Sequence, residues 1–432
     1  MSTPLDDESR LPSHDIMCID CKSFYASVEA IRRGEFPLAA KIAVMSNEES
    51  SGGLILASSP NTKYNYHVKL GTRRYEIHDD MDIEMVEPHM ADYIRKNYQI
   101  NMIYKQFTDD AHWFPYSIDE SFINVTGSHA LFGSNDDIAA AIQDRVFKQT
   151  GIVTTVGIGE NPLLAKLALD NAAKKQEPWR ATWTYKDVPE TLWKIDNLTD
   201  FWSIGARTAV RLNKLGIYSI YDLAHTDVAA LKKEFGVLGE AMYYHSWGID
   251  YSDITRRYVP RKANKGFGNS QVLMKDYRDA REIEIVLSEI ADQVATRLRA
   301  HRVQCEIVAI SVGFAEPDEQ NGGQTHWGAQ MRIDPTSSTA DLIRAVRFLF
   351  ATHWQGQALR NLAVRCSRIS EAHSQQLDLF ASAERQVANA KLEATIDRLR
   401  KRYGYKSLTR GYSKVDGATA IKRSGLVGGH QG

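Results

Sequence analysis

Residues 116–125 read YSIDESFINV, which is two short apolar stretches around an acidic pair. The pattern predicts a β-hairpin with Asp119 and Glu120 at its tip, where two neighbouring side chains can turn toward one site. A third acid, Asp20, ends the apolar stretch DIMCID at 15–20, which is typical of a buried strand. Clustered carboxylates are the ligands that Mg²⁺ prefers, and such cations serve phosphate chemistry. The three acids therefore predict a metal-dependent site.

The chain has 432 residues, of which 43% are hydrophobic, so it can bury several cores and we expect two to four domains. Its formal net charge is −1, so no overall field attracts it to a polyanion. Contact with nucleic acid would have to come from local basic runs. Residues 256–265 carry five basic side chains and residues 398–410 carry six, with no acid in either run. Both a solvated surface and a phosphate contact fit such runs.

Four cysteines are too few for a disulfide framework in a chain of this length. Residues 1–15 are polar and acidic, unlike a secretion signal, and the sequence contains no run of eighteen apolar residues, so we expect a cytoplasmic protein without a membrane span. Cys18 and Cys21 form a C-x-x-C pair. This pair lies in the predicted strand and no second pair follows it, so a zinc or redox site is the less favoured interpretation.

The strand at 15–20 leads directly into a predicted helix from Ser23 to a stop signal at Gly34. Two short strands at 41–46 and 54–58 surround a Gly-Gly turn and predict a small inserted subdomain. The elements expected after the hairpin are a helix at 136–149, a strand at 152–158 and a helix that opens at Asn161-Pro162. This order predicts a mixed sheet backed by helices.

The pattern changes near 198–216, where two short helices are expected around a Ser-Ile-Gly turn, and helical segments continue to residue 245. The elements expected beyond the basic run at 256–265 are a strand near 267–274, a helix at 281–300, strands at 305–314 and near 327–333, a helix at 339–353 and a strand at 361–369. This βαββαβ order predicts a compact terminal domain. After it, only an amphipathic helix near 383–401 is expected.

Three segments together resemble the Y-family translesion DNA polymerases: CIDCKSFYASVE at 18–29, YSIDESFINVTG at 116–127 and the helix-hairpin-helix at 201–216. The resemblance is greatest to the UmuC-like branch of Gram-positive bacteria and their mobile elements, and it covers nearly the whole chain. It implies an α+β multidomain fold arranged as a right-hand polymerase, with a mixed-sheet palm. The implied parts are a palm at 14–25 and 87–183, small fingers at 26–86, a helical thumb at 184–253, a basic linker at 254–265, a βαββαβ little finger at 266–370 and a C-terminal tail at 371–432.

The resemblance implies that Asp20, Asp119 and Glu120 are the catalytic, metal-binding acids and that the backbone carbonyl of Cys21 is a further ligand. Two Mg²⁺ ions would then clamp the attacking 3′-hydroxyl and the leaving pyrophosphate. The family usually has another acid where this chain has Lys22, so we assign no metal ligand there.

The resemblance also places residues around the sugar and base of an incoming nucleotide. Tyr25 stands where the family has the ring beneath the sugar, and Phe24 precedes it on the same helical turn, although a core position also fits Phe24. Ala57 and Ser58, followed by Ser59, resemble the floor beneath the nascent base pair. Small side chains there leave room for damaged or misshapen pairs.

Lys63 and Lys174 are the expected ligands of the triphosphate. Lys63 stands near the place where relatives carry a basic residue, and Lys174 ends a helix at which the family has a phosphate-binding lysine. The alternatives are Tyr64, Arg73 and Arg74 for the first position and Lys175 for the second. A Lys-Lys pair at the end of a helix also fits simple complementation of the helix dipole.

The Ser-Ile-Gly turn resembles a helix-hairpin-helix, in which turn amides and the start of the next helix hold a DNA phosphate. The expected DNA contacts are Ser203, Ile204, Gly205 and Arg207 in the hairpin, and Arg261 and Lys262 in the basic linker. Many relatives have glycine where this chain has Ser203.

A pentapeptide near the C-terminus resembles the peptide by which bacterial polymerases dock on the sliding clamp. Its residues are Gln376, Leu377, Asp378, Leu379 and Phe380. The peptide follows the last predicted strand, in a segment without a core of its own, where its apolar side chains would otherwise be exposed. The alternative interpretation is the start of a helix that packs on the terminal domain.

The resemblance as a whole implies a template-directed, error-tolerant DNA polymerase that uses two-metal nucleotidyl transfer. The expected partners are primer-template DNA, dNTPs and the bacterial sliding clamp, with a UmuD-like subunit and RecA as further candidates; no membrane partner is expected, and the expected location is the cytoplasm, at the nucleoid. Two alternatives stay open, namely a metal-dependent phosphodiesterase or nuclease and a non-catalytic DNA-scaffolding protein.

Overall fold

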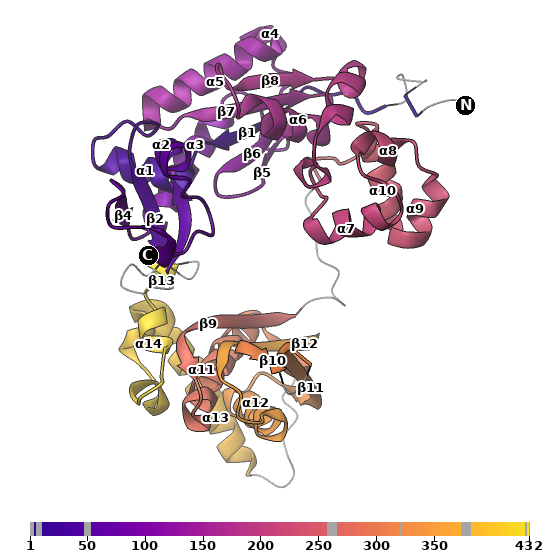
Figure 1. Cartoon of the computed structure of the whole chain (residues 1–432). Coiled ribbons are helices and arrows are strands. Elements are labelled where there is room, and N and C mark those ends of the chain that lie inside the picture. Colours follow the sequence, from indigo (N-terminus) through magenta and orange to yellow (C-terminus); the bar gives the residue numbers. More distant parts are fainter. Residues whose placement is uncertain are drawn as a thin grey trace. The chain divides into compact units, whose positions relative to one another are not determined.

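The computed structural model describes residues 4–5, 11–46, 53–256, 266–319, 322–372, 382–427 and 430–431. The chain divides into two compact units (Figure 1). Unit 1 comprises Met1–Arg257 and His430–Gly432, and unit 2 comprises Tyr258–Gly429.

Unit 1 is built on a five-stranded sheet with the order β5-β6-β1-β7-β8. Its strands are β1 (Ile16–Cys21), β5 (Trp113–Pro115), β6 (Glu120–Asn124), β7 (Thr154–Gly159) and β8 (Arg180–Trp183). The central strand β1 is antiparallel to both neighbours, whereas β7 and β8 are parallel. The mixed sheet expected from the sequence is therefore confirmed.

Helices cover both faces of this sheet. They are α3 (Met90–Tyr104), α4 (His129–Phe132), α5 (Asn135–Thr150) and α6 (Pro162–Ala168), which continues as a π-helical turn, η3 (Leu169–Ala173). Along β1, Met17 and Ile19 belong to the core beneath α3 and α5, whereas Ile16 and Cys18 pack on the opposite face against α6 and η3. Because side chains alternate along a strand, Asp20 shares the α6 face with Ile16 and Cys18.

Two glycines of β7 allow α6 to lie directly on the sheet. A Cβ atom at Gly157 would come within 2.0 Å of the Ala165 carbonyl oxygen, and one at Gly159 within 2.5 Å of the Ala165 amide nitrogen. No side chain fits in that space, so the two glycines fix the distance between the helix and the strand.

A smaller, three-stranded sheet has the order β3-β2-β4, with β2 (Ile42–Ser46), β3 (Leu54–Ser58) and β4 (Glu84–Val86). Three helical segments accompany it: α1 (Phe24–Arg32), α2 (Pro60–Tyr66) and η2 (Arg74–Glu76). Ser59 caps α2, because its Oγ atom accepts from the Thr62 amide, and its hydroxyl donates to the Ala40 carbonyl at 2.5 Å. This subdomain lies in the sequence between β1 and β6, as predicted.

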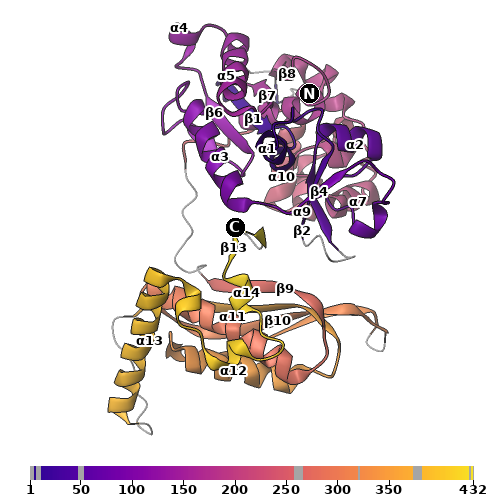
Figure 2. The ribbon, with the colours of Figure 1, turned by 90° about the vertical axis from the view of Figure 1, so that its left-hand side faces the viewer.

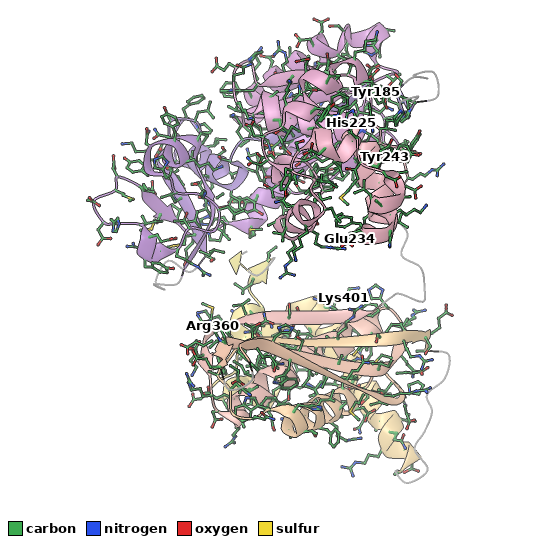
Figure 3. All side chains as sticks on the ribbon, turned by 45° about the vertical axis from the view of Figure 1, so that its right-hand side comes forward. Tyr185, His225, Glu234, Tyr243, Arg360 and Lys401 are labelled. Atoms are coloured by element: carbon green, nitrogen blue, oxygen red, sulfur yellow. The ribbon has the colours of Figure 1, made fainter. Side chains whose placement is uncertain are left out.

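The remainder of unit 1 is helical. Its elements are η4 (Tyr185–Glu190), η5 (Leu192–Lys194), η6 (Leu198–Asp200), α7 (Ala206–Lys214), α8 (Ile220–Ala224), α9 (Val228–Phe235) and α10 (Val237–Ser246). Its core consists mainly of leucine and isoleucine side chains, and at the surface His225 stacks on Tyr221 with ring centres 4.0 Å apart. Glu234, labelled in Figure 3, accepts from Arg211 at 2.7 Å at the surface. The helical part predicted to begin near residue 198 is confirmed.

Unit 2 contains an antiparallel sheet with the order β11-β10-β12-β9 (Figure 2). Its elements in chain order are β9 (Phe267–Tyr277), α11 (Ala280–Ala300), β10 (Val303–Asp318), β11 (Gln324–Thr336), α12 (Thr339–His353) and β12 (Leu359–Glu371). The βαββαβ order is as predicted. One core joins α11 and α12 to the sheet.

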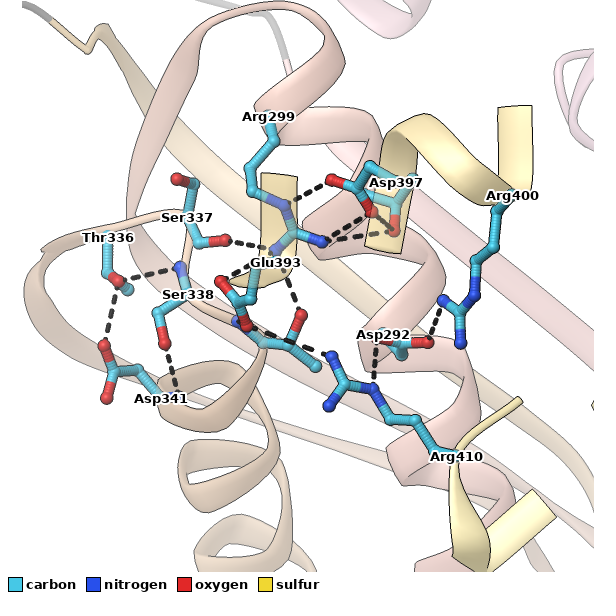
Figure 4. A network of polar contacts seen from close by, with 12 residues as sticks. Asp292, Arg299, Thr336, Ser337, Ser338, Asp341, Glu393, Asp397, Arg400 and Arg410 are labelled. Atoms are coloured by element: carbon cyan, nitrogen blue, oxygen red, sulfur yellow. Dashed lines mark hydrogen bonds and ion pairs between the residues drawn. The ribbon is translucent and has the colours of Figure 1, made fainter. Parts of the chain in front are cut away.

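The chain continues through α13 (Ala383–Tyr403), η9 (Tyr405–Ser407), η10 (Gly411–Lys414), α14 (Ala420–Arg423), β13 (Leu426–Val427) and β14 (His430–Gln431). Ion pairs attach α13 to α11 (Figure 4). Arg299 of α11 donates to Asp397 at 2.6 Å and contacts Glu393 at 3.3 Å. The helix expected near 383–401 is present, but the sequence does not show that it is attached to α11, because paired charges leave no apolar pattern to read.

Asp292 of α11 anchors the segment at a second point. Its side chain is only 2% exposed and accepts from Arg400 at 2.7 Å and from Arg410 at 2.9 Å. These arginines belong to the basic run at 398–410. Part of that run therefore serves the fold, and Arg398 and Lys401 are among its exposed members.

Among the helices in the part of the chain that the structure describes, none has the length and apolar character needed to cross a lipid bilayer.

Candidate active site

The acids of β1 and β6 lie side by side. Asp20 and Glu120 are direct partners in the antiparallel register, and the Cys21 amide donates to the Asp119 carbonyl at 2.9 Å. Glu120 shares its face of β6 with Phe122, which packs in the core beneath α6. Asp20 and Glu120 thus point to the same face of the sheet, and two stretches one hundred residues apart in the sequence meet there.

The hairpin differs in detail from the expectation. Its strands are β5 and β6, and the amides of Tyr116 and Ser117 both donate to the Glu120 carbonyl at 2.9 Å. The turn therefore occupies residues 116–119. Only Asp119 lies in it, and Glu120 begins the strand, so the prediction that both acids sit at the tip is wrong. The cause is a local bond from the Ser117 hydroxyl to Asp119 at 2.6 Å, which competes with strand pairing.

Two lysines from the helix above the sheet face these acids. Lys166, which is 7% exposed, donates to Glu120 at 2.8 Å. Lys174 lies 3.2 Å from Asp20. The other oxygen of Glu120 accepts from the Cys18 thiol at 3.0 Å, so this carboxylate is fully engaged.

Burial and neighbouring charges shift the pKa values of the site. Burial raises the pKa of Asp20 to about 6, although Lys174 opposes the shift, and the charges of Asp119 and Glu120 raise it further. Burial alone would lower the pKa of Lys166, but the neighbouring carboxylates of Glu120 and Asp170 outweigh it and raise the pKa above its ordinary value. The Lys166 ammonium is therefore fully charged at neutral pH.

Asp20 and Asp119 line a pocket of about 630 Å³, whereas Glu120 is not among its lining residues. Its lining includes nucleotide ligands expected from the sequence, namely Phe24, Tyr25, Ala57, Lys63 and Lys174. Phe24 is only 2% exposed and belongs mainly to the core, in line with the alternative interpretation. Lys63 donates to the Ser23 hydroxyl at 2.8 Å, at the edge of this pocket.

The pocket decides among several alternatives. Lys174 lines it, whereas Lys175 is exposed outside it. Tyr64 also lines it and is 82% exposed. Arg74 does not line it, because its guanidinium bonds the Ile77 carbonyl and Asp79, and Arg73 is likewise not among the lining residues.

Ser58 does not reach the pocket. Its side chain is fully buried, and its hydroxyl donates to the Val68 carbonyl at 2.6 Å. Ala57 and Ser58 face opposite sides of β3, so Ala57 lines the pocket together with Leu56, whereas Ser58 does not. The placement of Ser58 against the base pair is not supported.

The ring of Tyr25 is held from behind. It stacks on Tyr93 of α3 with ring centres 4.4 Å apart and an interplanar angle of 15°. The Tyr93 hydroxyl donates to the buried carboxylate of Glu29 at 2.7 Å. A fixed aromatic ring at the pocket wall is suited to excluding a substituent on a bound sugar.

The donor set suits a hard cation. Asp20, Asp119, Glu120 and the Cys21 carbonyl are all oxygen donors. Among the described residues, no three histidine, cysteine or acidic side chains are placed so that they could hold a metal ion together. Lys166 and Lys174 lie against two of the three acids and neutralise them. The residues therefore fit a divalent cation by the chemistry of their donor atoms.

The helix-hairpin-helix expected at 201–216 takes the form of η6, a turn and α7. Ser203 has a φ of 79°, in the left-handed region that favours glycine. Ile204 is buried, whereas Gly205, the N-cap of α7, and Arg207 in its first turn are exposed. Gly205 and Arg207 are thus accessible to a phosphate, whereas the Ile204 amide already donates to the Phe201 carbonyl at 3.1 Å.

Some expected site residues lie outside the described part of the chain. They are Arg261 and Lys262 of the basic linker and the clamp peptide, Gln376 to Phe380.

Sequence reasoning missed Lys166, Asp170 and Tyr93. The segment KLALD at 166–170 places a lysine and an acid four residues apart, which is the spacing of a helical ion pair. That signal alone does not say that the pair faces a catalytic acid. The glycines at 157 and 159 are the stronger clue, because small residues in a strand indicate a closely packed helix.

Comparison with known proteins gives the family. A sequence model of the impB/mucB/samB family matches residues 19–170, and a model of the C-terminal domain of the same family matches residues 264–379. The chain belongs to this family, the UmuC-like Y-family DNA polymerases. The predicted kinship is thereby confirmed.

Individual relatives cover nearly the full length. The chain is 38% identical over 428 residues to the "Putative UV-damage repair protein UvrX" of Bacillus subtilis, covering 98% of this chain and 99% of that protein. It is 33% identical over 418 residues to DNA polymerase IV 2 of the same organism, covering 96% of this chain and 98% of that protein. DNA polymerase IV of Moorella thermoacetica is 34% identical over 404 residues, covering 92% and 96%.

A solved structure shares the fold. It is a Y-family DNA polymerase chimera of Dbh and Dpo4, with a TM-score of 0.64 and 17% sequence identity, and the match covers 83% of this chain and 99% of that one. The predicted α+β multidomain polymerase fold is confirmed by this likeness.

Proposed function

We propose that this protein is a template-directed, error-tolerant translesion DNA polymerase, which transfers a nucleotide from a dNTP to the 3′-hydroxyl of a primer. Family membership supports the enzyme class, with primer-template DNA and nucleotides as substrates. The observation that carries the proposal is the register of β1 and β6, which sets Asp20 opposite Glu120 and beside Asp119 at the mouth of a pocket.

Dependence on a divalent metal follows from the family. We assign Asp20, Asp119, Glu120 and the Cys21 carbonyl as the residues that would hold two Mg²⁺ ions. When bound, such ions supply charge stabilisation for the attacking and leaving oxygens of an in-line displacement. The carboxylates position them, and the buried location of Asp20 strengthens each electrostatic interaction there.

The lysines at the pocket fit the triphosphate. Lys63 comes from α2 and Lys174 from the end of η3, so they approach one pocket from two different elements. A compact ammonium on a flexible stem binds a phosphate as a point charge.

Tyr25 and Ala57 account for the selection of the nucleotide. The Tyr25 ring, fixed by Tyr93, would exclude a 2′-hydroxyl from the sugar site. Ala57 presents only a methyl group to the base site, so a distorted pair meets little steric resistance. Error tolerance follows from the small floor, while selection of deoxyribose follows from the rigid wall.

We assign the polymerase parts to the chain as palm 14–25 and 87–183, fingers 26–86, thumb 184–253, basic linker 254–265, little finger 266–370 and tail 371–432. The hairpin at 203–205 with Arg207, and Arg261 and Lys262 of the linker, would contact the DNA backbone without reading its bases.

The other partners are proposed from sequence. Residues 376–380 would dock on the sliding clamp, which would add to DNA contact and compensate for low processivity. A UmuD-like subunit and RecA are candidates through kinship with UmuC. Kinship with bacterial DNA polymerases also supports a cytoplasmic location at the nucleoid.

Primer extension tests the reaction. The protein is incubated with dNTPs on an undamaged template and on one with an abasic site, with and without Mg²⁺. We expect the primer to be extended on both templates when Mg²⁺ is present and on neither template when it is absent. Shortening of the DNA would indicate a nuclease, and an unchanged primer on both templates would indicate a scaffold.

A further inference from the structure

Three charged residues form a ladder along the helix that covers the active site. Lys166, Asp170 and Lys174 follow one another at intervals of four residues. Asp170 lies 3.1 Å from the Lys166 ammonium and 2.9 Å from that of Lys174. One carboxylate is thus shared between two lysines.

A π-helical turn makes this arrangement possible. Residues eight apart on an α-helix lie roughly 80° from one another around the axis. The turn η3 takes up an extra residue, as the Lys174 amide donates to the Leu169 carbonyl five residues before it, at 3.0 Å. Lys174 therefore returns toward the stripe that carries Lys166 and Asp170, above the end of β1.

The two ends of the ladder rest on different catalytic acids. Lys166 contacts Glu120 at 2.8 Å, and Lys174 contacts Asp20 at 3.2 Å. Lys166 is buried, whereas about a third of the Lys174 side chain is exposed to the pocket. Lys166 is therefore fixed, and Lys174 can reach a ligand in the pocket.

Positive charge is crowded around this end of the helix. Lys22 donates to the Lys174 carbonyl at 3.4 Å, and its ammonium lies over the Trp179 ring. Burial lowers the pKa of both Lys22 and Lys63, and the charge of Lys174 contributes to the lowering in each case. Four lysines are thus matched by four acids, and Asp170 is the acid among them to which we assign no metal. The acids are Asp20, Asp119, Glu120 and Asp170.

We propose that Asp170 is a positioning residue that keeps Lys174 at the pocket when Asp20 gives up that lysine to bind a cation, so that the Lys174 ammonium is already in place for the triphosphate of the incoming nucleotide. The inference rests on the proposed function. If Asp20 bound a cation, Lys174 would lose its contact with Asp20 and keep its contact with Asp170. The Asp170 carboxylate also contacts Lys166, at 3.1 Å, so one acid holds both lysines.

Asp170→Asn tests this role, since it removes the charge and keeps the shape. The full chain is bound to a primer-template whose primer ends in a dideoxynucleotide, so no reaction occurs, and the next dNTP is titrated in Mg²⁺. We expect the Kd for the dNTP to rise about tenfold, as for loss of one partner of a partly buried ion pair. The Kd for DNA should stay within about twofold of the wild-type value, because Asp170 contacts a lysine of the pocket proposed for the nucleotide. In steady state, KM should rise more than kcat falls.

Matched variants separate this role from a general effect on the fold. Asp144→Asn removes an exposed acid that makes the same four-residue contact with Lys148 at 2.9 Å on α5, and should bind dNTP like wild type. Asp170→Glu keeps the charge and should restore most of the affinity. Thermal unfolding and DNA binding show whether Asp170→Asn is folded. If it is not folded, Asp170→Ser takes its place in the titration.

Equal dNTP affinity in wild type and Asp170→Asn would overturn the inference and leave the polymerase function intact. A wild-type complex that binds no dNTP in Mg²⁺ would instead overturn the proposed function on which the inference rests.

Discussion

Asp119 differs from the other two acids in what it contacts. Its carboxylate accepts from the Ser117 hydroxyl of its own turn at 2.6 Å, whereas Glu120 and Asp20 each face a lysine. Removal of Asp119 therefore leaves no buried lysine without a partner. Among the three acids, it offers the test of catalysis least confounded by a change in stability.

We expect Asp119→Ala to lower the rate of nucleotide incorporation by about 100-fold or more, since several kcal/mol of charge stabilisation would be lost. Affinity for primer-template DNA, measured by fluorescence anisotropy, should be nearly unchanged. Asp109→Ala, which removes an exposed acid bonded to His112, serves as the control. Incorporation by Asp119→Ala near the wild-type rate would remove the catalytic assignment.

In the function that we propose, Tyr25 selects the sugar. Because its ring stacks on Tyr93, it cannot turn aside easily, and a 2′-hydroxyl would meet it directly. Tyr25→Ala should raise ribonucleotide insertion relative to deoxyribonucleotide insertion about tenfold or more, measured as the ratio of kcat/KM values. Tyr25→Phe keeps the ring and should keep the ratio. An unchanged ratio in Tyr25→Ala would show that another group excludes the hydroxyl.

At the scale of elements, a buried carboxylate joins α1 to α3. Glu29 of α1 is inaccessible to solvent and accepts from Arg33 at 2.8 Å, from Tyr93 at 2.7 Å and from His89 at 2.9 Å. Burial alone would raise the pKa of Glu29, but the bonds from Arg33, Tyr93 and His89 outweigh it and lower the pKa below the ordinary value. The same network supports Tyr93, on which Tyr25 rests.

We expect Glu29→Gln to lower the free energy of unfolding at neutral pH by about 3 kcal/mol, since it breaks a buried charged network. The folded-state pKa is depressed, so the carboxylate contributes fully above its unfolded value of 4.5, and the contribution is lost as the pH falls through the folded value. The difference between the variant and wild type should therefore shrink below about pH 4.5, in urea unfolding curves across pH. A difference that is constant with pH would contradict the role of the charge.

Helices and strands could be predicted where apolar spacing carries the information. The strand at β1 and helix α12 follow from periodicity, and α12 begins and ends at the predicted residues. The turn before Glu120 could not be placed, because a single Ser117 hydroxyl decides its position. The ladder of Lys166, Asp170 and Lys174 could not be predicted either. Its role depends on which strand the helix covers, and that packing is a feature of the tertiary structure.

At the scale of the molecule, the C-terminal segment is held by charges that no local pattern reveals. Asp292 and Arg410 are more than one hundred residues apart in the sequence and meet at 2.9 Å. Sequence patterns describe neighbours along a helix or strand, so contacts of this kind stay hidden.

We expect Asp292→Ala to release α13 and the residues after it, because it leaves Arg400 and Arg410 partly buried without this acid, at a cost of roughly 3–5 kcal/mol. Faster amide hydrogen exchange across α13, with slow exchange kept in the sheet of unit 2, is the expected result. Arg398→Ala, a change to an exposed residue of the same helix, should exchange like wild type. Protection of α13 in Asp292→Ala equal to wild type would show that other contacts hold the segment.

The clamp peptide concerns the whole assembly on DNA. Replacing Leu379 and Phe380 by alanine removes two of the three apolar side chains of the pentapeptide, so stimulation of primer extension by the sliding clamp should be lost. Extension without the clamp should be unchanged. Gln386→Ala, a substitution in α13 outside the peptide, is the control. Full stimulation of the double variant would refute docking through this segment.

The two glycines of β7 affect more than the strand in which they lie. A methyl group at Gly157 would push α6 and η3 away from the sheet. The ammonium groups of Lys166 and Lys174 would then move away from the acids that they neutralise. Catalytic power would then fall without the loss of one reacting atom. Two missing side chains, on a strand that touches neither substrate nor ion, thus set the electrical balance on which the chemistry of this enzyme depends.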